Sequence, residues 1–297
     1  MIESFFRSMK RRLRIIRDML NKDIFVPWVN IEHFYSPFPS KKVIRNYAFE
    51  IVPDQISSIN LQTEEQINLL CDLERFYISL PFSEVKTNNL RYYYLNSYFS
   101  YSDAIFLFLM IRKLKPKKII EVGSGYSSSV MLDTNELYQN HEIVFTFIEP
   151  YPNRLKTLLK KEDLKYVTIH EDIVQNIPLD TFRQLQDGDI LFIDSSHTTK
   201  LNSDVNYIIH EILPVLSKGV YIHFHDIFYP FEYPKDWFED GRAWNEQYIL
   251  RAFLQYNHHF EIILFNSYLE KKIPDVLREK LPLTLKHRGQ SIWIKKL

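Results

Sequence analysis

The chain has 297 residues, of which 45% are apolar and 15% aromatic, enough to build a globular protein with a packed core. Lysine plus arginine and aspartate plus glutamate both number 37, so there is no basic field to favour a nucleic-acid partner. No run of eighteen apolar residues is present to form a transmembrane segment.

The first twenty residues, MIESFFRSMKRRLRIIRDML, combine basic and apolar side chains at roughly helical spacing. Their charges recur throughout, which argues against a signal peptide and against export. A basic amphipathic helix of this kind can pack on its own domain or on a partner, or it can contact an anionic membrane peripherally. We favour packing.

Residues 1–90 show no steady alternation of strands and helices and contain five prolines, Pro27, Pro37, Pro39, Pro53 and Pro81. We interpret this region as a helical or irregular accessory segment. It carries the single cysteine, Cys71, which excludes an internal disulfide and a thiolate metal cluster. We predict that Cys71 is a small buried hydrophobe and that the protein is cytoplasmic, in a reducing compartment.

Residues 91–297 alternate between short β-branched runs and helical stretches, which is typical of a mostly parallel sheet with helices on both faces. The predicted strands are 117–122, 142–149, 166–171, 189–194, 219–226, 260–266 and 291–296. The predicted helices are 127–138, 151–161, 201–216 and 242–256. The last connection, 267–290, is a poor candidate for a crossover helix, so we expect the final strand to be antiparallel.

The turn after the first strand, IIEVGSGYSSSVML, predicts a cofactor site. Gly123, Ser124 and Gly125 lie between a strand and a helix, where small residues let a ligand approach the backbone. Glu121 precedes them. A pyrophosphate is disfavoured by this carboxylate, whereas a positively charged sulfonium cofactor is attracted to it. A tight turn without a ligand is the alternative for the glycine pair taken alone.

The next two strands end in further acids. Glu149 follows the second strand, where an acidic side chain can accept hydrogen bonds from both hydroxyls of a ribose. Glu171 and Asp172 follow the third strand, and either of them can accept a hydrogen bond from an adenine amino group. A solvated carboxylate at a helix start is the alternative interpretation of Glu149.

The fourth and fifth strands end in IDSSHTTK and IHFHDIF, two neighbouring polar ends that predict the reaction site. In one interpretation, Asp194, His225 and Asp226 bind magnesium or another divalent metal, and Asp194 also borders the cofactor. In the other, no metal is needed, and His197 or His225 is the general base. The aromatic stretches 89–104 and 227–254 are candidates for the wall or lid of an acceptor pocket.

The motifs EVGSGYSSSVML, FIEPYP, LFIDSSH and HFHDIFYPFEYPKDW, followed by GRAWNEQYILRAFL, together resemble the bacterial class I S-adenosylmethionine-dependent methyltransferases. The resemblance covers about residues 90–297 and implies a Rossmann-like seven-stranded sheet of order 3-2-1-4-5-7-6. It extends distantly to metal-dependent O-methyltransferases, whose metal acids would correspond to Asp194 and to His225 with Asp226. His225 departs from that pattern, since it replaces an acid.

The resemblance implies methyl transfer from S-adenosylmethionine to a small-molecule acceptor, and the aspartate and histidine cluster favours a hydroxyl oxygen. A non-catalytic nucleotide-binding assembly subunit is one alternative. An NAD-dependent oxidoreductase or an aminopropyl transferase is another, and Glu121 argues against NAD. The sequence identifies neither the acceptor nor the oligomeric state.

Overall fold

A computed structural model describes residues 9, 13, 16 and 28–297. The chain divides into two compact units, one formed by Met1–Tyr47 with Phe238–Ala243 and the other by Ala48–Trp237 with Trp244–Leu297. The first unit contains α2 (Lys41–Asn46). Apart from three isolated residues, the predicted N-terminal amphipathic helix lies outside the described residues. No helix in the described part of the chain is long and apolar enough to cross a membrane.

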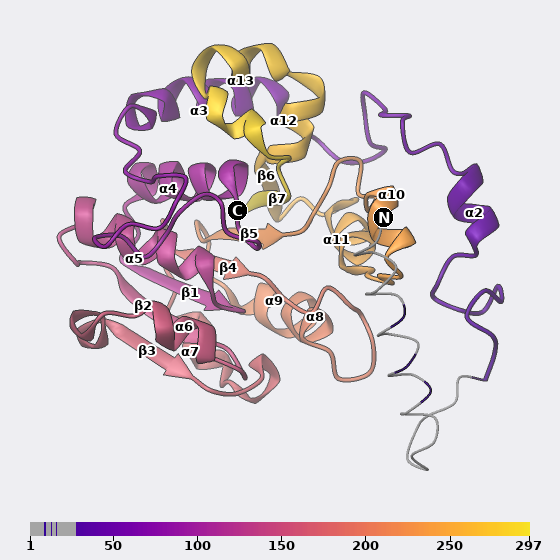
Figure 1. The fold of residues 1–297 in the computed structure, drawn as a ribbon, viewed down its shortest axis with the longest axis horizontal. Coiled ribbons are helices and arrows are strands. Elements are labelled where there is room, and N and C mark those ends of the chain that lie inside the picture. Colours follow the sequence, from indigo (N-terminus) through magenta and orange to yellow (C-terminus); the bar gives the residue numbers. More distant parts are fainter. Residues whose placement is uncertain (1–8, 10–12, 14–15, 17–27) are drawn as a thin grey trace. The chain divides into compact units, whose positions relative to one another are not determined.

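The second unit is built on one seven-stranded sheet of order β3-β2-β1-β4-β5-β7-β6, as predicted (Figure 1). β1 to β5 are mutually parallel, and β7 is antiparallel to both of its neighbours, β5 and β6. The strands are β1 (Lys118–Val122), β2 (Val144–Ile148), β3 (Val167–His170), β4 (Ile190–Ile193), β5 (Tyr221–His225), β6 (Phe260–Phe265) and β7 (Ser291–Lys296).

β4 is a continuous apolar run because helices cover both faces of the sheet. All four residues of β4 are buried. On one side, α3 (Thr63–Tyr77), α4 (Tyr101–Leu114) and α5 (Tyr126–Tyr138) pack in succession (Figure 1). Every residue of α4 from Tyr101 to Ile111 is buried, since the helix lies between its neighbours, and this explains its nearly uninterrupted apolar sequence.

Several predicted helices are shorter or more divided than expected. The predicted helix 151–161 is α6 (Asn153–Leu158) followed by the 3-10 turn η1 (Lys161–Lys165). The predicted helix 201–216 consists of α8 (Asp204–Tyr207), the π-helical turn η3 (Ile208–Ile212) and α9 (Leu213–Val215). Pro214 accounts for part of this division, because it has no N–H to donate to the preceding turn. The predicted helix 242–256 is reduced to α11 (Glu246–Leu254), and α7 (Leu179–Arg183) and α10 (Lys235–Glu239) are single short turns.

The connection before β7 is more helical than predicted. It contains α12 (Asn266–Lys272), α13 (Pro274–Lys280) and the 3-10 turn η4 (Pro282–Lys286). Pro274 and Pro282 each begin a new helical segment, a position where the missing N–H of proline costs nothing. The segment is therefore divided at its prolines, and the antiparallel β7 that follows is confirmed.

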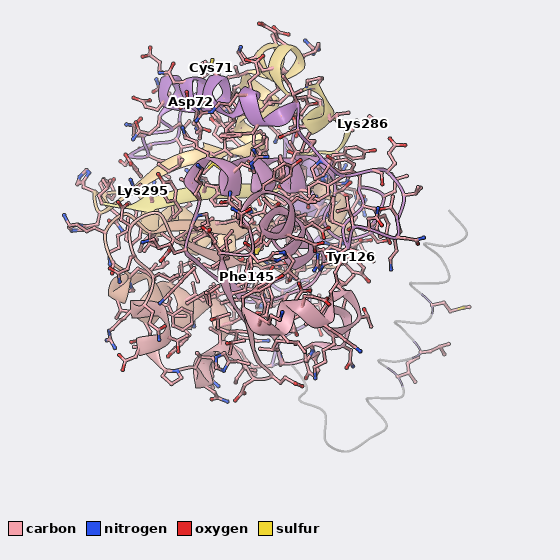
Figure 2. The ribbon with its side chains drawn as sticks, turned by 90° about the vertical axis from the view of Figure 1, so that its left-hand side faces the viewer. Cys71, Asp72, Tyr126, Phe145, Lys286 and Lys295 are labelled. Carbon is pink, nitrogen blue, oxygen red and sulfur yellow. The ribbon has the colours of Figure 1, made fainter. Side chains whose placement is uncertain are left out.

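Residues 48–90 pack in the same compact unit as the sheet, and buried residues of α3 such as Leu70 and Leu73 belong to its core. Their functional separation as an accessory segment stays a prediction. The prediction that Cys71 is buried is wrong, since Cys71 is exposed. Figure 2 shows it on α3 beside Asp72. Cys71 falls on the outer side of an amphipathic helix whose other side carries the buried leucines.

Candidate active site

A cavity of about 350 Å³ lies at the carboxyl ends of β1, β2 and β4, a volume within the range of small-molecule sites. Three of the predicted site residues line it, one after each strand: Gly123, Glu149 and Asp194. Its other lining residues are Val122, Ile148, Pro150, Ile173, Val174, Gln175, Ser195, Ser196, Lys200, Asn202, Ser203 and Asp204.

Gly123 is required by close packing as well as by its backbone conformation. Its φ is +81°, in the region that favours glycine. A Cβ at this position would lie 2.0 Å from the backbone oxygen of Asp194. Asp194 N–H donates to the Val122 carbonyl (2.8 Å), which joins β4 to β1, and Gly123 N–H donates to the Ile148 carbonyl (3.0 Å), which joins β1 to β2. The glycine therefore brings the predicted cofactor turn against the end of β4.

Gly125 and Glu121 are not among the residues that line the cavity. Gly125 caps the N-terminus of α5. The Glu121 side chain is fully buried and accepts hydrogen bonds of 2.5 Å from both Ser127 and Ser128. Burial raises the pKa of Glu121 to about 8, although the two serine hydroxyls oppose that shift. The predicted attraction of Glu121 for a cation stays a prediction.

Glu149 is held in place by backbone amides. Its Oε2 accepts from the N–H of Ser124 (3.2 Å), in the glycine turn, and its Oε1 accepts from the N–H of Tyr151 (2.8 Å). A carboxylate has about four acceptor sites, so both oxygens can still accept from a ligand hydroxyl. The structure thus places Glu149 beside the turn and orients it.

Glu171 and Asp172 do not line the cavity, and both have other partners. Glu171 forms an exposed ion pair with Lys156, and Asp172 accepts from Asn176 and from the N–H of Ile173. Gln175, which the sequence did not single out, does line the cavity. Its Oε1 is buried and has no hydrogen-bond partner among the residues that the structure describes.

The ends of β4 and β5 meet in a compact group that we call the acid–histidine cluster: Asp194, His197, His225, Asp226 and Glu246. His197 Nε2 lies 3.3 Å from Asp194 Oδ1 and 3.3 Å from Asp226 Oδ2. His225 Nδ1 lies 3.5 Å from a carboxylate oxygen of each of the same two aspartates. The predicted convergence of the two strand ends is therefore present in the structure.

Glu246 is the member of the cluster that the sequence did not indicate. Its Oε2 lies 2.7 Å from His197 Nδ1, and its Oε1 accepts from the Ser195 hydroxyl at 2.9 Å. It stands at the start of α11, 49 residues from His197 in the chain. No local pattern links two residues so far apart, although both belong to motifs that carried the family resemblance.

Two residues of the cluster have strained backbones. His197 and Asp226 have φ values of 57° and 58°, in the left-handed region that residues with a Cβ rarely adopt. Such strain costs on the order of 1–2 kcal/mol per residue and persists only where the surroundings enforce it. Strained backbones of this kind often occur at functional sites.

The surrounding carboxylates control the protonation of both histidines. Burial would lower the pKa of His225, but the charges of Asp226, Asp194 and Asp103 outweigh burial and raise the pKa to about 10. Burial likewise opposes protonation of His197, but hydrogen bonds to Asp194 and Glu246 raise the pKa of His197 well above its usual range. A histidine that already holds a proton is not a general base, so these shifts weigh against the metal-free interpretation.

The grouping best suited to a metal differs from the predicted set by one residue. Asp194, His197 and Asp226 each offer a ligand atom, and these three atoms lie within 4.8 Å of one another. The sequence placed His225 in the position that His197 takes here. The role of His225 as a ligand stays a prediction.

Aromatic side chains from both predicted lid segments reach the cluster. The ring of Trp244 lies 4.4 Å from that of His197, and the ring of Phe99 lies 5.3 Å from that of His225. Each comes from one of the aromatic stretches, 227–254 and 89–104 respectively. These rings supply apolar surface next to the polar cluster.

Comparison with known proteins gives three findings. The model of a family described as a methyltransferase domain matches residues 120–227, which include the glycine turn and both polar strand ends. A protein of Archaeoglobus fulgidus described as uncharacterized is 31% identical over 164 residues, covering 52% of this chain and 73% of its own length.

Among solved structures, an SAH-bound methyltransferase of Podospora anserina, PaMTH1, is 15% identical with a TM-score of 0.43, covering 82% of this chain and 100% of that one. The O-methyltransferase TomG of Streptomyces achromogenes, solved with SAM, is 12% identical with a TM-score of 0.43, covering 86% of this chain and 96% of that one. Likenesses this distant assign no role to any residue here.

Proposed function

Since the chain belongs to the Rossmann-like, S-adenosylmethionine-dependent methyltransferase family, we propose that it transfers the methyl group to a hydroxyl oxygen of a small molecule. One observation carries this proposal. Asp194 lines the cavity beside the glycine turn, and its carboxylate contacts both histidines of the acid–histidine cluster. A single residue therefore joins the proposed cofactor pocket to the proposed reaction site, where the methyl donor and the acceptor must meet.

The cofactor residues that we propose fit a polar ligand. Glu149 would accept hydrogen bonds from the ribose hydroxyls, and the turn Gly123–Ser124–Gly125 would border the methionine part, with Glu121 behind it. Ser124 Oγ and Gln175 Oε1 are buried and unpaired, which is costly unless a ligand or water satisfies them. We assign Gln175 to the adenine amino group, alongside the predicted Asp172.

The cluster also fits a divalent metal. Two carboxylates and one imidazole form a donor set that magnesium, manganese or another divalent ion accepts. Asp194, His197 and Asp226 would hold the ion, with His225 beside them. A bound metal there would lower the pKa of an acceptor hydroxyl and orient its oxygen toward the methyl group.

The chain's own residues have complementary tasks. The aspartates and Glu246 fix the orientation of His197, while Trp244 and Phe99 border the cluster with apolar surface. His225 carries positive charge among the aspartates and so limits their mutual repulsion. The cytoplasmic location and the absence of nucleic acid among the partners stay predictions.

The first test is calorimetric titration with S-adenosylhomocysteine, with and without magnesium or manganese. We expect binding, and we expect Glu149→Ala to weaken it at least about tenfold, the effect of removing a charged hydrogen-bond acceptor. Gln175→Ala should weaken binding about fivefold, as expected for one neutral hydrogen bond. Absence of binding by folded wild-type protein would refute the proposal.

A second test addresses the acceptor atom. Radiolabelled S-adenosylmethionine is offered with a panel of small alcohols, phenols, sugars, amines and thiols. Label transferred to hydroxyl oxygens supports the proposal. Transfer to amines alone would keep the methyltransferase assignment and overturn the choice of oxygen.

A further inference from the structure

The Glu246 side chain contacts two residues of the loop that follows β4. Its carboxylate is almost fully buried, with 1% of the side chain exposed, at the start of a helix whose other buried residues include Leu250 and Leu254. Burying a carboxylate is costly unless it is hydrogen-bonded. Its oxygens have His197 Nδ1 and Ser195 Oγ within hydrogen-bond distance, so both contacts reach the loop that follows β4.

The backbone of the same helix start holds the same loop. The N–H groups of Asn245 and Glu246 both donate to the His197 carbonyl, at 2.9 and 3.2 Å. The Asn245 side chain in turn accepts from the N–H of Thr199 at 2.6 Å. His197 is therefore held through its backbone and its ring by one short segment, which explains how its left-handed backbone is maintained.

The contact with Glu246 also selects which ring nitrogen of His197 faces the cluster. A carboxylate only accepts hydrogen bonds, so the nitrogen 2.7 Å from Glu246, Nδ1, carries a hydrogen. Nε2 points at Asp194 and Asp226 and is the nitrogen that would give up its proton if an ion bound there. A histidine ligand is commonly fixed in this way by a carboxylate on its other nitrogen.

We propose that Glu246 is a positioning residue, which fixes the ring orientation and tautomer of His197 so that Nε2 is presented to the ion or acceptor held by Asp194 and Asp226. The role of this positioning rests on the proposed function, whereas the contacts of Glu246 with His197 are geometric observations. It singles out His197, rather than His225, as the histidine that is prepared for the reaction.

The test uses the full chain and the variant Glu246→Gln, with Glu246→Asp as the conservative variant. Glu232→Gln is the matched control, because the Glu232 carboxylate accepts a hydrogen bond from Tyr248 on the same helix and is not in the cluster. Three quantities are measured: the ring ¹⁵N chemical shifts of His197, the affinity for Mn²⁺ alone and the affinity for S-adenosylhomocysteine.

We expect Glu246→Gln to change the His197 ring shifts and to weaken Mn²⁺ binding about 10- to 100-fold, while S-adenosylhomocysteine affinity changes less than about twofold. Glu246→Asp should recover part of the Mn²⁺ affinity, and Glu232→Gln should match the wild type. Unchanged His197 shifts in both Glu246 variants would overturn the proposal. Failure of the wild type to bind S-adenosylhomocysteine would count against the proposed function instead, because the ring shifts do not depend on it.

Discussion

The two halves of the candidate active site differ in how their residues are brought together. The cofactor cavity is lined by the turns that follow β1, β2 and β4 together with residues from 173–175 and 200–204, and its glycine turn is a single contiguous segment. The acid–histidine cluster joins the ends of two strands to the start of α11, and its members His197 and Glu246 are 49 positions apart in the chain. The first half depends mainly on backbone shape and the second on side chains supplied by distant segments.

The largest expected effect tests the glycine turn of the cofactor cavity. In Gly123→Ala the new methyl group would lie 2.0 Å from the Asp194 carbonyl oxygen, so β1 and β4 must separate. We expect the free energy of unfolding to fall by about 4 kcal/mol, combining backbone strain with overpacking. Urea denaturation measures the change.

Gly188→Ala is the matched control for this prediction. Gly188 has a similar φ of +86°, but nothing lies within 4 Å of a Cβ built there. Only the backbone strain remains, and we expect the free energy of unfolding to fall by about 1 kcal/mol. Equal losses in the two variants would show that the contact with Asp194 is unimportant.

An intermediate effect is expected in the acid–histidine cluster. Asp194→Asn removes a carboxylate from the cluster but keeps its shape, so Mn²⁺ affinity should fall about 100-fold, while S-adenosylhomocysteine affinity falls less than about threefold. Calorimetry measures both affinities. Asp204→Asn is the control, since Asp204 lines the same cavity and hydrogen-bonds Ser196 outside the cluster. If Asp194→Asn lowered the affinities for Mn²⁺ and for S-adenosylhomocysteine to the same extent, the cofactor cavity and the acid–histidine cluster would not be separable.

A pH-dependent effect concerns Glu121, which comes two residues before Gly123 in the chain. Its pKa is raised by burial to about 8, so the folded protein holds a proton that the unfolded chain releases near the usual value for glutamate. The stability from this proton is complete at low pH and is lost as the pH rises toward 8. Between pH 5 and 7.5 the loss is about 1.4 kcal/mol per pH unit.

Glu121→Gln removes this titration with little change of shape. Unfolding free energies measured across the same pH range should therefore decline less steeply in the variant than in the wild type. Parallel curves would show that Glu121 is already ionised in the folded protein and would support its predicted role as a carboxylate facing a cation.

The sequence predicted the sheet and its order well, because short β-branched runs alternate with helical stretches along residues 91–297 and because the motif series resembled one family. It also placed Gly123, Glu149 and Asp194 correctly at one edge of the sheet. It missed Gln175 and Glu246, whose importance depends on what lies opposite them. The exposure of Cys71 was missed for a similar reason, since a lone cysteine carries no sign of which helix face packs.

The position of β7 has a consequence for synthesis of the chain on the ribosome. β7 lies between β5 and β6, and β6 pairs with no other strand of the sheet. Until residues 291–296 have emerged, the nascent protein therefore carries one open sheet edge at β5 and one unpaired apolar strand, β6. Such edges readily pair with other chains. The nascent chain is thus most exposed to aggregation between the emergence of β6 and that of β7, when the glycine turn and the first five strands are already made, and a chaperone would have most to protect at that stage.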